Sequence, residues 1–490
     1  MPHTFAHRFS TIALAGVASM ALGACATIPG ANVAPGSPIT AEEAQVGAQY
    51  HDQFVAEFGG EMTGPYAQYV EQVGQNIAVQ SGLADSRSAF EITLLNSSVN
   101  NAFAVPGGYV YTTRQLVNLM NNEAELAAVL GHEVGHVAAR HSARRQQTAQ
   151  RNQLLGLLGA VIGGGLLGSS ELAQLSMQGS QALTLSYSRS QELEADQLGV
   201  DYLNSAGYDP RAMATLLTSL ATQNQLDAQL QGRDNATIPE WASTHPDPAS
   251  RVQNAMQLAG NATGVLNRET FLSRIDGMIY GDDPQQGVIE GSTFIHPVLR
   301  FSFTAPQGFY MINGTRAVSI NGDAGRAQLT LGQYNGDLDA YVRSVFTAIG
   351  GDQQQLSPSS VSRTTVNGLP AAYATVRVNN GQQQVDVTVF AYQFDNSTAY
   401  HFQAITPAGQ SGTFNSLYSS MRRISASEAG SVVPRRIDIV TAARSDTVAT
   451  LSRRMAYDDA QEARFRVLNG LSSTDNVVPG REYKIVVRSN

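Results

Sequence analysis

His132, Glu133 and His136 are the residues whose spacing predicts chemistry most directly. They stand in the order His-Glu-x-x-His, after a run of helix-forming residues without proline. On a helix the two imidazoles would lie one above the other, where they can share one zinc ion with Glu133 beside it. Residues 127–139 are otherwise almost wholly apolar, and buried polar side chains need partners. The pattern therefore predicts a zinc site on a buried helix rather than two surface histidines.

A peptidase zinc site needs a third protein ligand, and His141 is the first candidate. It follows His132 by nine residues. On an ideal helix that spacing places it about half a turn out of phase with the zinc-binding face. We therefore interpret His141 as a solvated or supporting histidine.

The segment 187–199 offers a better ligand. On a helix Glu192 and Asp196 would share one face. Glu192 is the predicted ligand, and Asp196 is predicted to accept the N–H of a ligating histidine. Arg189 is predicted to lie close behind the ligands. The alternative is a solvated acidic helix on which Arg189 merely pairs with Glu192.

The whole chain has 490 residues, which suits roughly two to four domains. It is 42% hydrophobic and 14% charged, as folded proteins are, and its net charge is -9. Nucleic-acid phosphates are neutralised by clustered Lys and Arg, and this chain has no basic block. Nucleic acid is therefore excluded as a partner.

Residues 1–24 predict a lipoprotein signal peptide. A basic start at Arg8 and a short apolar run are followed by the sequence Leu-Gly-Ala-Cys, which ends at Cys25. This is the only cysteine in the chain, so its predicted role is to carry lipid. Ala26, by similarity to Gram-negative lipoproteins, points to the outer membrane facing the periplasm, with residues 25–39 as a tether. The alternative is an ordinary signal peptide whose cysteine is incidental.

Two further regions predict a multidomain chain. Residues 40–262 are mostly helical with a few strand-like runs, typical of a mainly α (α+β) zincin-type metalloprotease domain. Residues 290–425 change to short alternating runs with one helix, typical of a β-rich α+β domain. The phrase at 303–309 resembles the opening of a PsbP-type fold.

Residues 435–490 resemble a LysM module, a small βααβ unit. The resemblance is carried by residues 445–448, 468–471 and 478–480. LysM modules bind peptidoglycan glycan chains, so the resemblance implies peptidoglycan as a partner. Ser445 stands where the usual glycine precedes the aspartate, which leaves a packing domain of the same shape as an equal alternative.

The ordered motifs together resemble one family of gluzincin zinc metalloproteases. The His-Glu-x-x-His helix is followed by Ser-Arg-x-x-Glu-x-Glu-Ala-Asp-x-x-Gly at 188–199. This order is similar to the CAAX-prenyl endopeptidase and HtpX type, in its periplasmic BepA-like branch. Residues 100–108 resemble the family's edge strand, and residues 243–251 resemble its Thr-His-Pro…Arg segment. The branch carries helical repeats at its C-terminal end and this chain does not, so the clients of that branch are not carried over.

The resemblance implies a zinc metalloendopeptidase with one zinc ion held by His132, His136 and Glu192. Glu133 would act as the general base. His245 would be the second catalytic residue, either as a latch on the open zinc position or as a stabiliser of the oxyanion. Substrate peptides would add to the edge strand by main-chain hydrogen bonds. The residues implied there are Asn101, Ala102 and Phe103.

These features predict a lipid-anchored periplasmic endopeptidase that cleaves unfolded or misassembled envelope proteins in outer-membrane protein quality control. Its partners would be protein substrates, the membrane through lipidated Cys25, and peptidoglycan through residues 435–490. The alternative is a lipid-anchored chaperone or cell-wall adaptor with a silent or latched zinc site. A peptidoglycan hydrolase ranks third.

Overall fold

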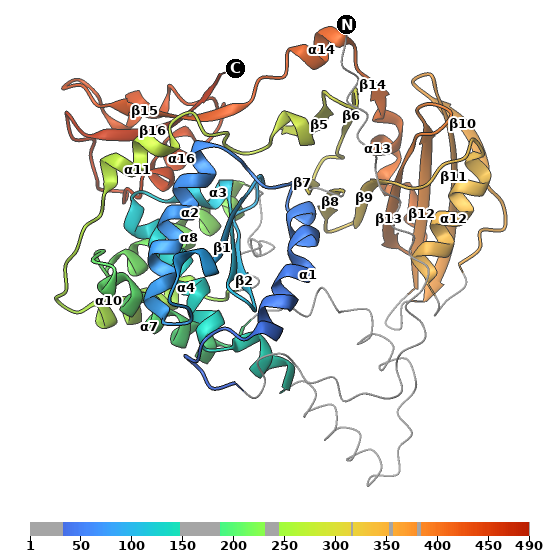
Figure 1. The fold of residues 1–490 in the computed structure, drawn as a ribbon. Coiled ribbons are helices and arrows are strands. Elements are labelled where there is room, and N and C mark those ends of the chain that lie inside the picture. The colour runs from blue at the N-terminus through green and yellow to red at the C-terminus, as the bar shows by residue number, and fades with distance from the viewer. Residues whose placement is uncertain are drawn as a thin grey trace, which may run out of the picture.

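The computed structural model describes residues 33–147, 187–230, 245–314, 317–351, 356–379 and 384–489 (Figure 1). The predicted signal peptide and Cys25 lie outside the described residues. A mainly helical region and a β-rich region stand side by side in Figure 1. No helix among the described residues is both long and apolar enough to cross a membrane.

The helical region combines helices with a small sheet, as the sequence predicts. Its sheet has the order β1-β3-β2, with β1 parallel and β2 antiparallel to the central strand. Thr40 and Glu43 form a capping box at the start of the first helix. The helices are α1 (Ala41–Glu57), α2 (Pro65–Ala78), α3 (Arg114–Leu119), α4 (Glu123–Ala138), α7 (Arg189–Ser205), α8 (Ala212–Leu230), α10 (Pro248–Ala259) and α11 (Arg268–Ile275), and the strands are β1 (Glu91–Leu95), β2 (Ala102–Val105) and β3 (Tyr109–Thr113).

Helix α4 is the central element of this region, and nearly all of it is buried. Its N-cap is Asn122, whose side chain accepts a hydrogen bond from the Glu125 N–H. The helix ends before Arg140, which has a positive φ of 52° and whose guanidinium pairs with Glu43 of α1. Both ends of the metal-motif helix are therefore held by side-chain contacts.

Helices α4 and α7 approach each other through their backbones. A Cβ added to Gly135 would lie 3.0 Å from the carbonyl oxygen of Ala195. A Cβ added to Gly199 would lie 3.2 Å from the backbone nitrogen of His132. Side chains at these two positions would push the helices apart, so the glycines place Glu192 within reach of the histidines.

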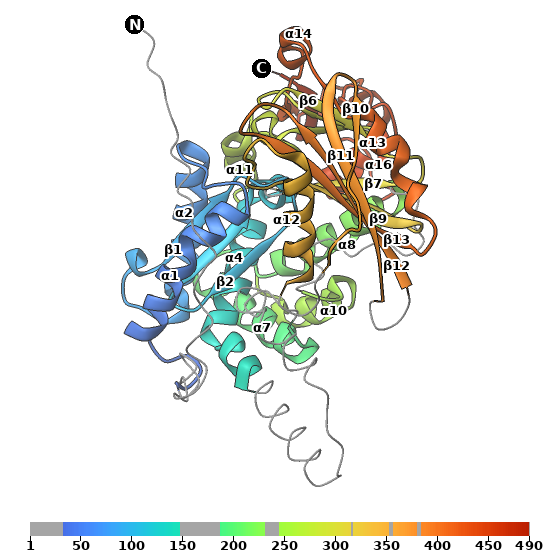
Figure 2. The same ribbon diagram turned by 90° about the vertical axis from the view of Figure 1, so that its right-hand side faces the viewer.

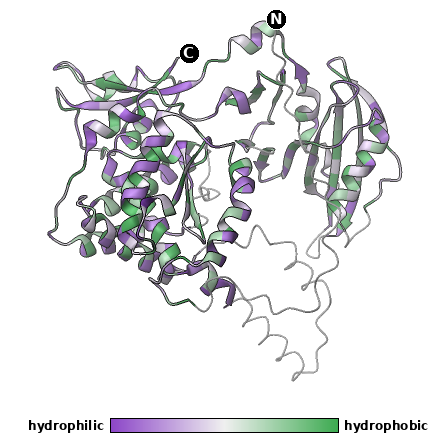
Figure 3. Ribbon diagram, in the orientation of Figure 1, coloured by the Kyte–Doolittle hydropathy of each residue, from purple (hydrophilic) through white to green (hydrophobic). Residues whose placement is uncertain are grey.

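The β-rich region contains two antiparallel sheets. The larger has seven strands in the order β10-β11-β12-β13-β9-β8-β7, and the smaller has the order β14-β6-β5-β4. Figure 3 shows apolar and polar residues side by side on most strands and helices, as expected for elements that bury one face. The strands are β4 (Val288–Glu290), β5 (Thr293–His296), β6 (Phe301–Thr304), β7 (Tyr310–Asn313), β8 (Val318–Gly322), β9 (Gly325–Leu331), β10 (Ser362–Val366), β11 (Leu369–Asn379), β12 (Gln384–Gln393), β13 (Ala399–Pro407) and β14 (Arg422–Arg423), and the helices are α12 (Leu338–Gly350), α13 (Asn415–Ser420) and α14 (Ala426–Gly430).

The C-terminal segment has the predicted βααβ order, and its two strands pair with each other in antiparallel fashion. Its elements are β15 (Arg435–Thr441), α15 (Val448–Ser452), α16 (Gln461–Leu468) and β16 (Glu482–Arg488). Its apolar side chains share one hydrophobic cluster with those of the helical region. Helix α11, which lies beyond the predicted domain end at 262, contributes to the same cluster. The identity of the segment as a LysM module stays a prediction.

Lys484 ties this segment to the helical region. It is the only lysine in the chain, and its side chain is fully buried. Its ammonium donates to the carbonyl oxygens of Asn118 at 2.9 Å and Leu119 at 3.2 Å, and also to that of Met120. These carbonyls belong to the end of α3, where the helix leaves acceptors unsatisfied. One side chain therefore caps the helix that precedes α4.

We expect Lys484→Met to destabilise the docked C-terminal segment by about 3 kcal/mol, because buried carbonyls lose their donor. Denaturant unfolding measures the free-energy change. Amine-reactive labelling gives a second readout, since Lys484 in the unmodified chain is the only side-chain amine and should be protected. Arg481→Met, at an exposed position nearby, is the control. Rapid labelling of Lys484 in the folded protein would contradict the docking.

His401 in β13 makes the stability of the β-rich region depend on pH. Burial lowers its pKa from 6.5 to about 4, and its Nδ1 lies 2.9 Å from the hydroxyl of Tyr341. Between these two pKa values the unfolded chain binds more protons than the folded one, so stability is full above pH 6.5 and falls toward pH 4.

We expect His401 to cost the folded region about 2 kcal/mol on going from pH 8 to pH 5. His401→Gln should remove that part of the pH dependence while keeping an acceptor for Tyr341. Hydrogen exchange in β9 and β13 at the two pH values measures the local free energy of opening. Parallel pH profiles for both proteins would contradict the assignment.

Candidate metal centre

Four buried side chains converge between α4, α7 and the start of α10. They are His132, His136, Glu192 and His245, and one potential ligand atom from each lies within 4.8 Å of all the others. The Nε2 atoms of His132 and His136 are 3.0 Å apart. Glu192 oxygens lie 3.6 Å from the first of these nitrogens and 3.5 Å from the second. The predicted helices thus bring the predicted ligands together.

This cluster fits a tetrahedral zinc ion. Two ligands at zinc distances of about 2.0–2.1 Å stand about 3.3 Å apart, which the separations within the cluster approach. His245 completes the set, because its Nδ1 lies 3.3 Å from Nε2 of His132 and 3.1 Å from Glu192. Three nitrogens and a carboxylate oxygen are donors that zinc prefers. The side chains present are therefore compatible with one zinc ion.

Charge in the cluster is arranged for a cation. Burial lowers the pKa of His136 well below its usual value, so its imidazole is neutral and able to ligate. Burial opposes ionisation of Glu192, but His245 and His136 outweigh it and hold the pKa of that carboxyl far below its usual range. His136 is therefore neutral and Glu192 ionised, which are the forms in which each can bind zinc.

Glu133 lies beside the cluster without completing it. Its side chain is fully buried, and neither carboxylate oxygen has a hydrogen-bond partner in the described part of the chain. One oxygen lies 3.4 Å from Nε2 of His245. Burial raises the pKa of Glu133, which brings it toward the range of a general base at neutral pH. Such an unsatisfied buried carboxyl is expected where a water or substrate group binds.

Asp196 and Arg251 hold the ligands from behind. Asp196 lies 3.0 Å from Nδ1 of His132, the contact that the sequence predicts for it. Arg251 donates to Asp196 at 2.7 Å through Nε and pairs with one oxygen of Glu192. The other oxygen of Glu192 remains turned toward His136 and His245. A ligand carboxylate and the acceptor of a ligand histidine therefore share one buried guanidinium.

Arg251 takes the place that the sequence interpretation gave to Arg189. Arg189 occupies the first turn of α7 and is exposed, whereas Arg251 from α10 is 1% exposed and contacts the ligands. Arg251 is the arginine that ends the 243–251 segment. The sequence analysis found this segment similar to the family's Thr-His-Pro…Arg segment but predicted no role for its arginine. Sequence proximity favoured Arg189, but the N-terminal turn of α7 directs that side chain outward.

His141 supports a ligand from the second side. Its Nδ1 lies 2.7 Å from Nδ1 of His136, and its Nε2 lies 3.2 Å from Glu194. When His136 ligates through Nε2, its Nδ1 carries the proton and donates it to His141, which can then donate to Glu194. Of the two interpretations open for His141, the geometry favours the supporting one.

A small cavity connects the cluster with the edge strand β2. It has a volume of about 20 Å³ and is lined by Ala104 and Val105 of β2, His136 and Tyr187, among others. The Tyr187 ring stacks on His136 with centroids 3.8 Å apart. Tyr187 directly precedes the 188–199 motif, but the sequence analysis predicted no role for its side chain.

The predicted substrate-binding residues lie on β2, the outer strand of the three-stranded sheet. Ala102 and Phe103 are buried, and the Phe103 ring packs on Tyr111 with centroids 4.7 Å apart. The Asn101 side chain is also buried, and its Oδ1 has no hydrogen-bond partner among the described residues. Binding at this strand would therefore use main-chain groups rather than these side chains.

A buried His-Glu-x-x-His helix completed by a glutamate from a second helix defines a metallopeptidase domain of the gluzincin class. Residues 66–259 match the model of Peptidase family M48. The chain therefore carries a domain of Peptidase family M48, a family of metalloendopeptidases.

Three relatives share this region. The beta-barrel assembly-enhancing protease of Escherichia coli O157:H7 is 34% identical over 249 residues, 48% of this chain and 47% of that protein. The mitochondrial metalloendopeptidase OMA1 of Schizosaccharomyces pombe is 29% identical over 232 residues, 46% of this chain and 64% of that protein. The metalloprotease LoiP of Escherichia coli K12 is 32% identical over 154 residues, 31% of this chain and 56% of that protein. The chain spans about half the length of the beta-barrel assembly-enhancing proteases that it matches.

Among solved structures, the chain resembles cyanobacterial PsbP from Synechocystis with a TM-score of 0.21 and 15% identity. The match covers 28% of this chain and 98% of that one. A score this low carries no argument, so the PsbP-type resemblance of the β-rich region stays a prediction.

We expect His141→Phe to weaken zinc binding about 10- to 100-fold, because His136 loses the acceptor that orients its ring. Competitive titration of the metal-free protein against a zinc chelator measures the affinity. Glu194→Gln should give a smaller loss in the same direction. Arg189→Ala, on the same helix but exposed, should leave the affinity unchanged. Equal affinities for all variants would contradict a supporting role for His141.

Proposed function

We propose that the chain is a zinc-dependent endopeptidase that cleaves unfolded or misassembled envelope proteins. The observation that carries the proposal is the unsatisfied, buried carboxyl of Glu133 beside a cluster that fits zinc. A structural zinc site needs no such group, whereas peptide hydrolysis needs a base at this place. The M48 domain and the metalloproteases that share it support the same activity.

His132, His136 and Glu192 are the proposed ligands. A zinc ion held there would act as a Lewis acid and lower the pKa of water toward about 7. Glu133 would accept the proton of the attacking water and pass it to the leaving amine. Asp196 keeps the proton of His132 on Nδ1, and Arg251 fixes the Glu192 carboxylate by pairing with one of its oxygens.

His245 supports a second candidate function. Its Nδ1 lies among the ligand atoms, where it can close the fourth position as a latch. A site kept closed in this way would suit a lipid-anchored chaperone or cell-wall adaptor with a silent zinc site.

The envelope setting rests on the sequence and on the relatives. The proposed anchor is lipid on Cys25, and the proposed location is the periplasmic face of a Gram-negative outer membrane. A relative's name, beta-barrel assembly-enhancing protease, supports envelope proteins as substrates. The βααβ segment at 435–490 is the proposed contact with peptidoglycan.

We expect Glu133→Gln to lower cleavage of a denatured outer-membrane protein about a thousandfold while zinc stays bound, because only the proton acceptor is lost. Cleavage is followed by gel electrophoresis, and zinc content by atomic absorption. A chelator should abolish the cleavage by the unmodified protein, and zinc should restore it. Glu71→Gln, at an exposed position of α2, is the matched control. Absence of cleavage by the unmodified, zinc-loaded protein would favour the adaptor instead.

A further inference from the structure

One face of the seven-stranded sheet is only partly covered. Helix α12 packs on β11 and β12, where Val342, Val345 and Phe346 join the side chains of those strands in one hydrophobic cluster. Figure 2 shows the helix lying along that half of the sheet. The opposite face carries a separate cluster built from β6, β9, β13 and α13. On the same face, β13 contributes only Ala399 to this cluster, and β8 and β9 contribute none of their described residues.

The open half presents three cross-strand pairs in register. Residues 326, 328 and 330 of β9 stand opposite residues 405, 403 and 401 of β13. Because side chains alternate along a strand, all six point to the α12 face, and the three pairs span about 13 Å. The intervening residues 327, 329, 402 and 404 belong to the core on the other face.

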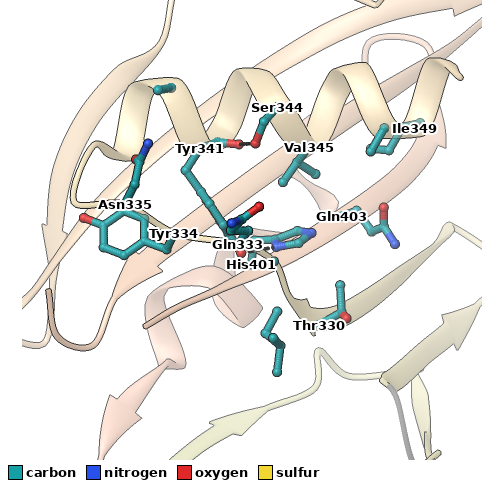
Figure 4. Close-up of a pocket in the computed structure, with 14 residues that line it drawn as sticks. Thr330, Gln333, Tyr334, Asn335, Tyr341, Ser344, Val345, Ile349, His401 and Gln403 are labelled. Atoms are coloured by element: carbon teal, nitrogen blue, oxygen red, sulfur yellow. Dashed lines mark hydrogen bonds between the residues drawn. The ribbon is translucent and has the colours of Figure 1, made fainter. Parts of the chain in front are cut away.

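These pairs and one side of α12 enclose a groove, called the α12 groove below. Its main cavity has a volume of about 820 Å³, and a second hollow of about 300 Å³ continues from it past Gln403 and Ile349. Figure 4 shows Tyr341, Ser344 and Val345 of the helix above His401 and Gln403 of the sheet.

The main cavity of the α12 groove is polar without being charged, whereas Arg326 lines the hollow that continues it. No Asp, Glu, Lys or Arg is among the described residues that line the main cavity. His401 is neutral at physiological pH, because burial lowers its pKa to about 4. An anionic or cationic ligand would therefore lose its hydration without gaining a counter-charge. The main cavity therefore suits an uncharged ligand.

Carboxamide side chains mark the kind of ligand. Gln333, Asn335 and Gln403 line the main cavity, and Gln328 and Asn321 line the hollow that continues it. Each carboxamide has the donors and the acceptor that pair with a peptide group. Gln403 and Gln328 share one hydrogen bond of 3.1 Å, which leaves the other amide hydrogens for a ligand. Carboxamides spaced along the groove can therefore pair with successive peptide groups of an extended main chain.

Apolar side chains at the rim are exposed in the absence of a ligand. Ile405 is 51% exposed and Ile349 is 36% exposed. Aliphatic side chains of a bound segment would cover them. The buried hydroxyl of Tyr334 in the wall has no hydrogen-bond partner among the described residues, which a ligand would supply.

We propose that the α12 groove binds an extended, uncharged segment of the polypeptide substrate. The proposal rests on the proposed function, because it assigns the groove to the same substrates. In Figure 1, α12 lies on the side of its sheet that faces away from the helical region. The groove is thus a recruitment site rather than part of the cleavage site. Binding there raises the local concentration of the same chain near the metal centre.

The direct test measures binding without cleavage. The full chain with Glu133→Gln is titrated with a fluorescent, acetylated and amidated peptide of alternating Gln, Thr and Val residues. Ala348→Trp places an indole on the groove side of α12, where Ala348 is exposed, and should weaken binding about tenfold or more. Thr347→Trp, an exposed neighbour that does not line the groove, is the matched control and should bind normally.

Two further measurements make the outcome decisive. Replacing alternate Thr residues of the peptide by Glu should weaken binding, because the main cavity offers no counter-charge and Arg326 lines only the adjoining hollow. In the cleavage-competent protein, Ala348→Trp should raise KM for a denatured protein about tenfold with kcat unchanged, and leave a short peptide substrate unaffected.

Equal binding by the Ala348→Trp and Thr347→Trp proteins would overturn the proposal. Binding of an N-acetylglucosamine oligosaccharide without binding of the peptide would also overturn the proposal, because the groove would then be a glycan site. Absence of any cleavage by the zinc-loaded protein would contradict the proposed function but not the proposed peptide binding. Selective binding of the uncharged peptide would still support the groove as a peptide site.

Discussion

The backbone contact between α4 and α7 is the constraint on which the metal centre depends. Gly135 lies inside the His-Glu-x-x-His motif, and Gly199 ends the acidic motif. Both positions face the backbone of the other helix so closely that a Cβ would come within 3.0–3.2 Å of it. A carboxylate side chain is short, so Glu192 can reach the imidazoles only from a helix packed at this distance. The two glycines thus set the geometry of a site in which neither takes part.

The carboxylates of the metal centre are buried, so their negative charge must be compensated within the protein. Glu133, Glu192 and Asp196 are all fully buried, and Arg251 is the guanidinium that balances two of them. Isolated buried carboxylates are costly unless they are paired or bind a cation. Arg251 lowers the pKa of Asp196 by hydrogen bonding against the opposing effect of burial. The remaining negative charge is the physical reason why this cluster suits a divalent ion.

The three regions of the chain are joined by polar contacts as well as by apolar packing. Lys484 inserts into the end of α3, which directly precedes the loop to α4. Glu290, at the start of the β-rich region, pairs with Arg435 and Arg488 of the C-terminal strands. The C-terminal segment therefore contacts both the region that holds the metal cluster and the region that holds the α12 groove.

The chain's local patterns determined much of the metal centre in advance. The helix period alone places His132 and His136 on one face of α4, and Glu192 and Asp196 on one face of α7. Side chains at i and i+4 lie on the same face of any α-helix. The capping boxes, the β2–β3 hairpin and the βααβ order are likewise local, and the structure contains each of them.

Only the three-dimensional fold decided which arginine supports the ligands. Arg251 and Glu192 lie 59 residues apart in sequence, and no periodicity relates them. The same holds for the burial of Lys484 and for the open half of the seven-stranded sheet. Which surfaces remain uncovered depends on how far α12 extends over strands that are distant in sequence, and alternation along each strand is the same whether its face is covered or open.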